Sequence, residues 1–291
     1  MNDTSSPWRG RRVLVTGGTG FLGSAVVREL LGHGAEVVGL VRDRVADAEF
    51  TRHRLTGKVH AVHGRAEDLF RVHSALAVHE VRAVFHLADT DRGTATVLDA
   101  ARRYDNRIPV VLARPDGTPF AAPAGQPVGV ARFGELFGGG DRKTFRAVPA
   151  AVVALLTGER PAAGEDGPAR DFVPVRDAAR ACAALAARLV AEPGARVEER
   201  AFRSGWVLTE REITAAVREV FAGRRAESVG AARRARLGGV ADAHRRARRD
   251  DRVVSGVPAD PVLRHPPRRG AGPGRGVSRG GPHVPCRRHC A

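Results

Sequence analysis

Three regularly spaced glycines near the start of the chain have the form needed to hold a phosphate group. Gly17, Gly20 and Gly23 follow an apolar run of strand type, Arg12–Thr16, and precede residues 24–31, whose apolar residues have helical spacing. Glycines in such a turn let the backbone approach a pyrophosphate, while the N–H groups of the following helix point at the phosphates. The pattern predicts a dinucleotide-binding turn; the alternative is a glycine-rich turn without a ligand.

The end of the next apolar run carries two charges that could select the dinucleotide. The predicted strand Glu36–Val41 is followed by Arg42 and Asp43. An acid at this position accepts hydrogen bonds from the ribose hydroxyls, whereas an arginine accommodates a 2′-phosphate. Because Arg42 comes first, NADP is slightly favoured, and NAD stays open. Either residue could instead be an ordinary solvated charge.

The remaining apolar runs continue a parallel sheet with intervening helices. Further strands are expected over residues 59–62, 83–88, 108–113 and 127–133, and helices over residues 94–103, 145–158, 176–192 and 209–221. The fold class is therefore α/β, a doubly wound parallel sheet of Rossmann type with a small C-terminal substrate lobe and a disordered basic tail. We expect a Rossmann domain over residues 8–133, the lobe over 134–223 and the tail over 224–291.

Two residues with reactive side chains are interpreted as core residues. His86 stands inside an apolar strand and Cys182 on an alanine-rich helix. Three cysteines are too few for a disulfide scaffold, which fits a cytoplasmic protein. His283, Cys286, His289 and Cys290 could supply four metal ligands, but the adjacent His289-Cys290 pair is awkward for a closed tetrahedral site. No metal site is predicted.

Five segments occur in the order seen in the extended short-chain dehydrogenases/reductases. They read VLVTGGTGFLGSAVVRELLGHGAEVVGLVRD, VFHLA, RGTATVLDAARR, FGELFGGGD and RDFVPVRDAARACAAL. Over about residues 8–222 the chain resembles, more narrowly, the nucleotide-sugar epimerases and 4,6-dehydratases, such as the GDP-mannose and CDP-glucose dehydratases. The resemblance implies a bound NAD or NADP, a nucleotide-sugar ligand, and chemistry that begins with hydride abstraction from the hexose.

The resemblance also implies roles for single residues. The cofactor-binding set comprises Gly17, Gly20, Phe21, Leu22, Gly23, Arg42, Asp43, Leu87 and Ala88. Glu135 and Arg170 fall in segments that the family uses for the substrate, although the family more often has Asn where Glu135 stands. After the third strand, Arg65 takes the place of a family acid, while Asp68 is retained.

The catalytic pair of the family is missing. The family uses Tyr-x-x-x-Lys on one helix, where the lysine lowers the tyrosine pKa and the tyrosine takes the substrate proton. Here Tyr104 is the only tyrosine and Ile108 stands four positions later; the only lysines are Lys58 and Lys143. We therefore predict no catalytic residues.

A short connection explains the loss of this pair. Only thirteen residues, 114–126, join the fifth and sixth strands, where the family has several dozen that include the whole catalytic helix. Losing that helix would expose apolar strand surface unless another element covers it. Residues 145–156 are a candidate cover.

Charge is concentrated at the C-terminal end of the chain. Lys and Arg number 48 against 32 Asp and Glu, a formal charge of +16, and residues 224–291 hold 17 arginines against five acids. The tail could bind a partner, be a solvated extension, or result from a frame change in a GC-rich gene. No aromatic residue follows Phe221, so nucleic acid is not an expected partner.

Alternative functions stay open at this stage. The chain is either a degenerate epimerase/dehydratase or a non-catalytic NAD(P)-binding regulator or partner subunit that uses its basic tail; a product without function is a third reading. A homodimer is compatible with the resemblance. No apolar run is long enough to span a membrane and residues 1–12 lack a secretory signal, so a cytoplasmic location is expected.

Overall fold

The computed structural model describes residues 6–42, 55–88, 90–121, 123, 125–160 and 167–230. Several expectations fall on residues outside this described set. They concern Asp43, the four candidate metal ligands near the C-terminus, and the tail from residue 231 onward.

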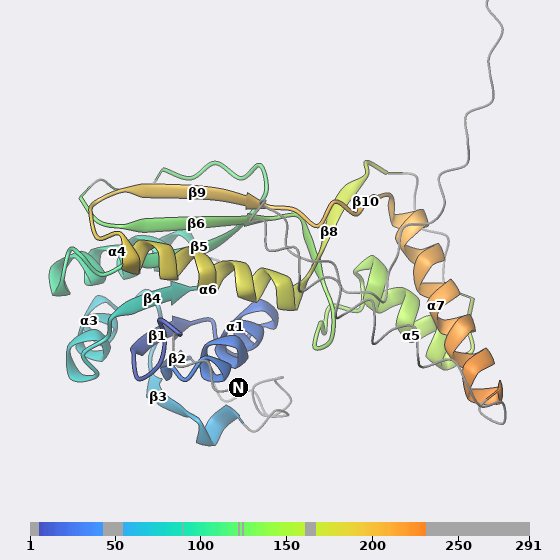
Figure 1. The fold of residues 1–291 in the computed structure, drawn as a ribbon, viewed down its shortest axis with the longest axis horizontal. Helices are drawn as coiled ribbons and strands as arrows, with labels where there is room; N and C mark the ends of the chain where they lie inside the picture. The colour runs from blue at the N-terminus through green and yellow to red at the C-terminus, as the bar shows by residue number, and fades with distance from the viewer. Residues whose placement is uncertain are drawn as a thin grey trace, which may run out of the picture.

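A seven-stranded sheet runs through the larger part of the molecule, on the left in Figure 1. Its strand order is β3-β2-β1-β4-β5-β6-β9, and each neighbouring pair is parallel. The strands are β1 (Arg12–Thr16), β2 (Glu36–Val41), β3 (Val59–His63), β4 (Ala83–His86), β5 (Val110–Pro115), β6 (Val128–Phe133) and β9 (Val197–Phe202). This confirms the Rossmann-type α/β fold. The seventh strand, β9, is not among the strands expected from the sequence.

Helices cover both faces of the sheet because successive strand residues point to opposite sides. Val13 and Val15 of β1 pack with α1 (Phe21–Gly32) and α6 (Val175–Ala191). Leu14 packs on the other side, in the cluster that contains α3 (Leu69–Val78) and α4 (Asp91–Tyr104). A short 3-10 helix, Leu55–Gly57, precedes β3. The core is therefore two apolar layers separated by the sheet.

The described residues of the connection between β5 and β6 form no helix. β5 continues through Pro115, so the connection is residues 116–127, shorter still than the thirteen residues expected. Because β5 and β6 are parallel, the connection must return along the length of a six-residue strand, about 20 Å, and an extended segment of this size is long enough to do so. Phe120 packs against the cluster that contains the buried Val128 and Val130, and Arg132 of β6 donates hydrogen bonds to the Pro115 and Thr118 carbonyls.

This connecting segment, and not residues 145–156, therefore lies on the α4 side of the sheet. The expected cover was wrong: α5 (Ala147–Thr157) packs against α7 (Glu210–Gly230) at the far end of the molecule (Figure 1). Several apolar side chains around α5 stay exposed, among them Phe145 and Leu156.

A second, three-stranded sheet connects the end of the molecule that contains α5 and α7 to the seven-stranded sheet. Its order is β10 (Val207–Leu208), β8 (Arg170–Pro174) and β7 (Glu135–Phe137). The expected capping box opens α7, because the Thr209 and Glu212 backbone N–H groups each donate to the other residue's side chain. α7 continues to Gly230, beyond the end expected at Phe221.

Candidate cofactor and ligand site

The glycine turn is packed too closely for side chains at two of its three positions. Gly17 has a φ of 71°, and a Cβ there would lie 2.7 Å from the Ala88 backbone nitrogen. A Cβ on Gly23 would lie 2.0 Å from the Gly17 carbonyl oxygen. These glycines let the turn fold against Leu87 and Ala88 at the end of β4, which brings together four residues of the predicted cofactor set.

Gly20 is less tightly enclosed than Gly17 and Gly23. A Cβ there would meet only the Gly17 carbonyl oxygen, at 3.1 Å, and Gly20 lines a cavity of about 640 Å³. Gly20 is also the N-cap of α1 and, as a glycine, supplies no side-chain cap to this helix. The first N–H groups of α1 therefore begin at the cavity, where an anion would be stabilised by them and by the helix dipole.

This large cavity, called here the cofactor cavity, lies at the carboxyl ends of the strands. Residues 19–22 of the turn form one wall, residues 113–115 of β5 a second, and residues 133–136 and 140–143 with Arg146 a third. In a parallel α/β sheet this edge is where ligands bind. Of the predicted cofactor residues, Gly20, Phe21, Leu22 and Leu87 line it directly.

Arg114, near the end of β5, lines the cofactor cavity. Its side chain is 9% exposed, and its guanidinium donates to Asp91 Oδ1 and to Thr94 Oγ1, each at 3.3 Å. No tyrosine lines the cofactor cavity, and Tyr104 instead contacts His73, at the end of α4. Lys143 is the one lysine of the cavity wall. The described residues thus bring no Tyr/Lys pair to this edge.

His86 forms part of a buried hydrogen-bonded chain below the cavity. Its Nδ1 lies 2.6 Å from Thr16 Oγ1, and its Nε2 lies 3.1 Å from Thr94 Oγ1. Because the Thr94 hydroxyl donates to the Thr90 carbonyl, its oxygen accepts from Nε2–H, which leaves Nδ1 to accept from Thr16. Burial, with a smaller contribution from the nearby Arg114, lowers the pKa of His86 to about 4. It is therefore a satisfied core histidine, as the sequence indicates.

The region at the end of β2 carries an acid that the sequence interpretation missed. Arg42 is exposed at the end of β2, and Glu67 lies close enough for Arg42 to affect its charge. A backbone hydrogen bond and the Thr90 hydroxyl, followed by Arg65 and Arg42, hold the pKa of Glu67 below its usual value. Asp68 instead caps α3 through the Arg71 N–H.

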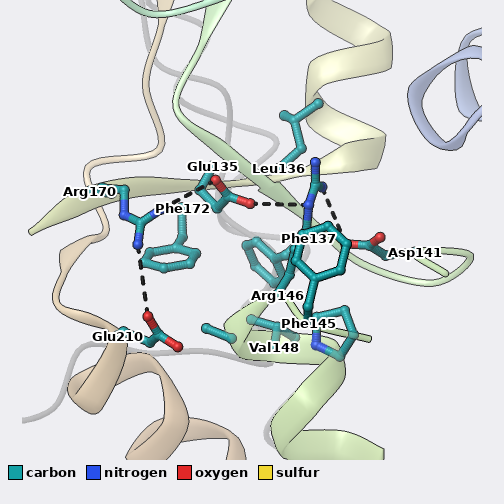
Figure 2. A pocket seen from close by; sticks show the side chains of 12 residues that line it. Glu135, Leu136, Phe137, Asp141, Phe145, Arg146, Val148, Arg170, Phe172 and Glu210 are labelled. Carbon is teal, nitrogen blue, oxygen red and sulfur yellow. Dashed lines mark hydrogen bonds and ion pairs between the residues drawn. The ribbon is translucent and has the colours of Figure 1, made fainter. Parts of the chain in front are cut away.

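A second cavity of about 220 Å³, called here the arginine cavity, is drawn in Figure 2. It adjoins the first because Glu135 and Arg146 line both cavities. Glu135 begins β7 and Arg170 begins β8, so the pairing of these strands brings the two predicted substrate residues together. Their charged groups lie 3.7 Å apart, and Arg146 lies 3.5 Å from the other Glu135 oxygen. The ring of Phe172 closes one side of the cavity.

Three charged residues of this cavity were not expected. Arg146 is the N-cap of α5 and pairs with Asp141 at 3.4 Å, and Glu210 at the start of α7 lies 3.9 Å from Arg170. A single arginine at the head of a long apolar helix is the signal that could have indicated Arg146. Asp171, beside Arg170, has a structural role, since it accepts from the Ser204 and Gly205 backbone N–H groups.

Other reactive groups in the described part of the chain are not arranged as sites. Cys182 is fully buried, and burial raises the pKa of its thiol to about 12, so it is no nucleophile at neutral pH. No group of three or more potential metal ligands occurs among the described residues. Within the same residues, no helix combines the length and apolar character that crossing a bilayer requires.

Comparison with known proteins agrees with this geometry. Residues 13–113 match the model of the NAD dependent epimerase/dehydratase family. The segment belongs to this family. The epimerase/dehydratase segment is 35% identical over 99 residues to the UDP-glucose 4-epimerase of Lactobacillus helveticus; the match covers 33% of this chain and only 28% of that epimerase. The expected family is thus confirmed for residues 13–113.

Solved structures extend the likeness of the epimerase/dehydratase fold beyond this segment. The dTDP-glucose 4,6-dehydratase of Bacillus anthracis, in complex with NAD, aligns with a TM-score of 0.62 at 18% identity, covering 73% of this chain and 82% of that one. The UDP-glucose 4-epimerase of Thermotoga maritima, with UDP-glucose, aligns at 0.58 and 19% identity, covering 72% and 82%. At these identities the likeness shows the fold alone.

Proposed function

We propose that this chain binds NAD or NADP in the cofactor cavity, with the pyrophosphate at the turn formed by Gly17, Gly20 and Gly23. The observation that carries the proposal is Gly20, which lines the cofactor cavity at the N-cap of α1 and has no side chain to occupy the space there. Phe21 and Leu22 would contribute their backbone N–H groups, while Leu87 and Ala88 would pass beneath the dinucleotide. Arg42 would face the adenosine ribose, with Asp43 beside it in sequence.

We propose a nucleotide sugar as the second ligand, held by the arginine cavity. Relatives of the same fold include a UDP-glucose 4-epimerase with UDP-glucose bound. The support from this chain is a pair of guanidinium groups, Arg146 and Arg170, beside the cofactor cavity, since arginine is suited to phosphate recognition. In this proposal the cofactor domain comprises residues 8–133 together with α6 and β9, which pack on or belong to the seven-stranded sheet, and the ligand lobe comprises the remainder of residues 134–223.

We further propose that the chain does not turn over by the family's mechanism. A bound NAD would supply a hydride acceptor for a sugar hydroxyl carbon, but removing the hydroxyl proton requires a positioned base. The cavity wall holds Arg114, a permanent cation, at the end of β5, and none of its described residues is a tyrosine. The chain is therefore proposed to be a non-catalytic binder derived from the epimerase/dehydratase family, acting as a regulator or partner subunit.

Titration of the full chain with NADH and NADPH, followed by cofactor fluorescence, tests cofactor binding. The Gly20→Leu variant is expected to lose binding because its side chain fills the pyrophosphate position. Gly32→Ala, near the end of the same helix and with no atom within 4 Å of its new Cβ, is the matched control and should bind as the wild type does. Equal binding by the Gly20→Leu variant would contradict the proposed site.

Turnover is tested separately. Purified chain incubated with NAD and UDP-glucose or dTDP-glucose is expected to give neither a 4-keto sugar nor an epimer, as analysed by mass spectrometry and chromatography. Accumulation of either product above an enzyme-free control would refute the proposed loss of catalysis but would not contradict the proposed cofactor binding.

A further inference from the structure

Glu135 bridges the two arginines of the arginine cavity. One of its carboxylate oxygens lies 3.5 Å from Arg146 Nε and the other 3.7 Å from Arg170 Nη1 (Figure 2). Its backbone is held at the start of β7, in register with Phe172 of β8. Glu135 also lines the cofactor cavity, so its side chain stands between the two cavities.

The arginine cavity already contains more negative than positive groups. Arg146 has a second carboxylate partner in Asp141, and Arg170 has one in Glu210. The lining therefore carries three carboxylates against two guanidinium groups. Of the three acids, only Glu135 contacts both arginines. If the two phosphates of a nucleoside diphosphate were bound by Arg146 and Arg170, Glu135 would be the acid next to both of these ion pairs.

We propose that Glu135 is a specificity-determining residue that acts as an internal anion, competing with the phosphate groups of a nucleoside diphosphate for Arg146 and Arg170. This inference rests on the proposed nucleotide-sugar ligand and concerns the affinity with which this chain binds it. A phosphate that approaches either guanidinium must share it with this carboxylate or displace it. The displaced carboxylate stays tethered within a few ångströms of the phosphate, and like charges at that distance repel.

A neutral side chain of the same shape should relieve this competition. In the Glu135→Gln variant both arginines lose a carboxylate partner and keep their second one, Asp141 or Glu210. The variant therefore frees positive charge at the cavity without removing the other contacts that position each guanidinium. A nucleoside diphosphate should bind more tightly, whereas a nucleoside without phosphates should be unaffected.

The test is calorimetric titration of the full chain with UDP and with uridine at physiological ionic strength. We expect Glu135→Gln to bind UDP about tenfold more tightly than the wild type, with no change for uridine. Glu219→Gln is the matched control, because Glu219 is exposed on α7, outside the cavity lining, and its replacement changes the net charge equally. Adding Arg170→Gln to the Glu135→Gln variant should remove most of the gain.

Each outcome decides the inference. UDP affinity that is equal to or weaker than that of the wild type in folded Glu135→Gln, verified by thermal unfolding, overturns it, as does undetectable UDP binding in both proteins. An equal gain in Glu219→Gln also overturns it, since the effect would then be one of overall charge. Failure of the wild type to bind NADH would count against the proposed cofactor function, but the comparison of UDP affinities would still decide the role of Glu135.

Discussion

The guanidinium group of Arg114 stacks on the ring of Phe120, with its central carbon 5.0 Å from the ring centroid. The pair joins the end of β5 to the connecting segment that follows it. In this fold a helix normally covers that side of the sheet, so a short segment anchored by a cation–π contact does the covering here.

Replacing Phe120 with alanine should therefore destabilise the Rossmann domain. We expect the free energy of unfolding to fall by about 1–3 kcal/mol, because the variant loses both the cation–π contact and the packing over the sheet. Urea unfolding followed by circular dichroism measures the change. Phe70→Ala is the control, since Phe70 is 76% exposed and its loss should cost less than about 0.5 kcal/mol. Equal losses in the two variants would show that Phe120 does not anchor the segment.

His86 should make stability depend on pH. The pKa of His86 is lowered from 6.5 to about 4 in the folded chain, so as pH falls the unfolded chain takes up the proton first. The free energy of unfolding contributed by this residue is therefore complete above about pH 6.5 and decreases as pH falls toward 4, by at most about 3 kcal/mol.

Urea unfolding at several pH values in this window, for the wild type and for His86→Gln, measures the effect. The variant should show a shallower decrease in stability between pH 6.5 and 4, because glutamine hydrogen bonds without titrating. Acidic groups titrate in both proteins and cancel in the comparison. Identical pH slopes would mean that His86 does not remain neutral in the folded state.

The structure agrees with the sequence interpretation where a pattern is local. β1 and β2 begin and end at the expected residues, because a continuous apolar run bounded by charges or glycine is typical of a buried parallel strand. The glycine turn and the Thr209–Glu212 capping box are likewise set by neighbours in sequence.

Features that depend on distant partners were not predicted. β9 includes Glu198, Glu199 and Arg200, and such a charged segment becomes a strand only because it pairs with β6 along the sheet edge. The arginine cavity is similar: Glu135 and Arg170 were expected from the family pattern, but their bridge through Arg146 requires β7, β8 and α5 to be in place. The spacing of these residues along the chain does not indicate that their side chains come into contact.

The first turn of α7 offers a direct test of the ligand lobe. The Thr209 hydroxyl accepts from the Glu212 N–H at 3.2 Å, so Thr209→Ala leaves that donor without its cap. We expect a loss of about 1 kcal/mol in the free energy of unfolding of this lobe, measured by urea unfolding. Thr209→Ser keeps the hydroxyl and should retain most of the stability. A serine variant as unstable as the alanine variant would mean that the methyl group, and not the cap, stabilises the lobe.

Arg42 should determine which dinucleotide is preferred. It is exposed at the end of β2, where the ribose 2′-position of a bound cofactor lies in this fold, and a guanidinium there can pair with a 2′-phosphate. Glu67 lies nearby, and because a carboxylate there would repel a 2′-phosphate, we expect the balance between these two charges to set the selectivity. Arg42→Ala is expected to weaken NADPH binding by about tenfold and to leave NADH binding nearly unchanged.

Fluorescence titration with both cofactors measures this ratio, and Arg11→Ala serves as the matched control. Arg11 is also exposed but precedes β1, at the opposite edge of the parallel sheet, so its removal changes the net charge equally without touching the ribose position. The Arg11 variant should keep the wild-type ratio of NADPH to NADH affinity. If Arg42→Ala also keeps that ratio, Arg42 is a solvated surface charge and selectivity lies with Glu67 or Asp43.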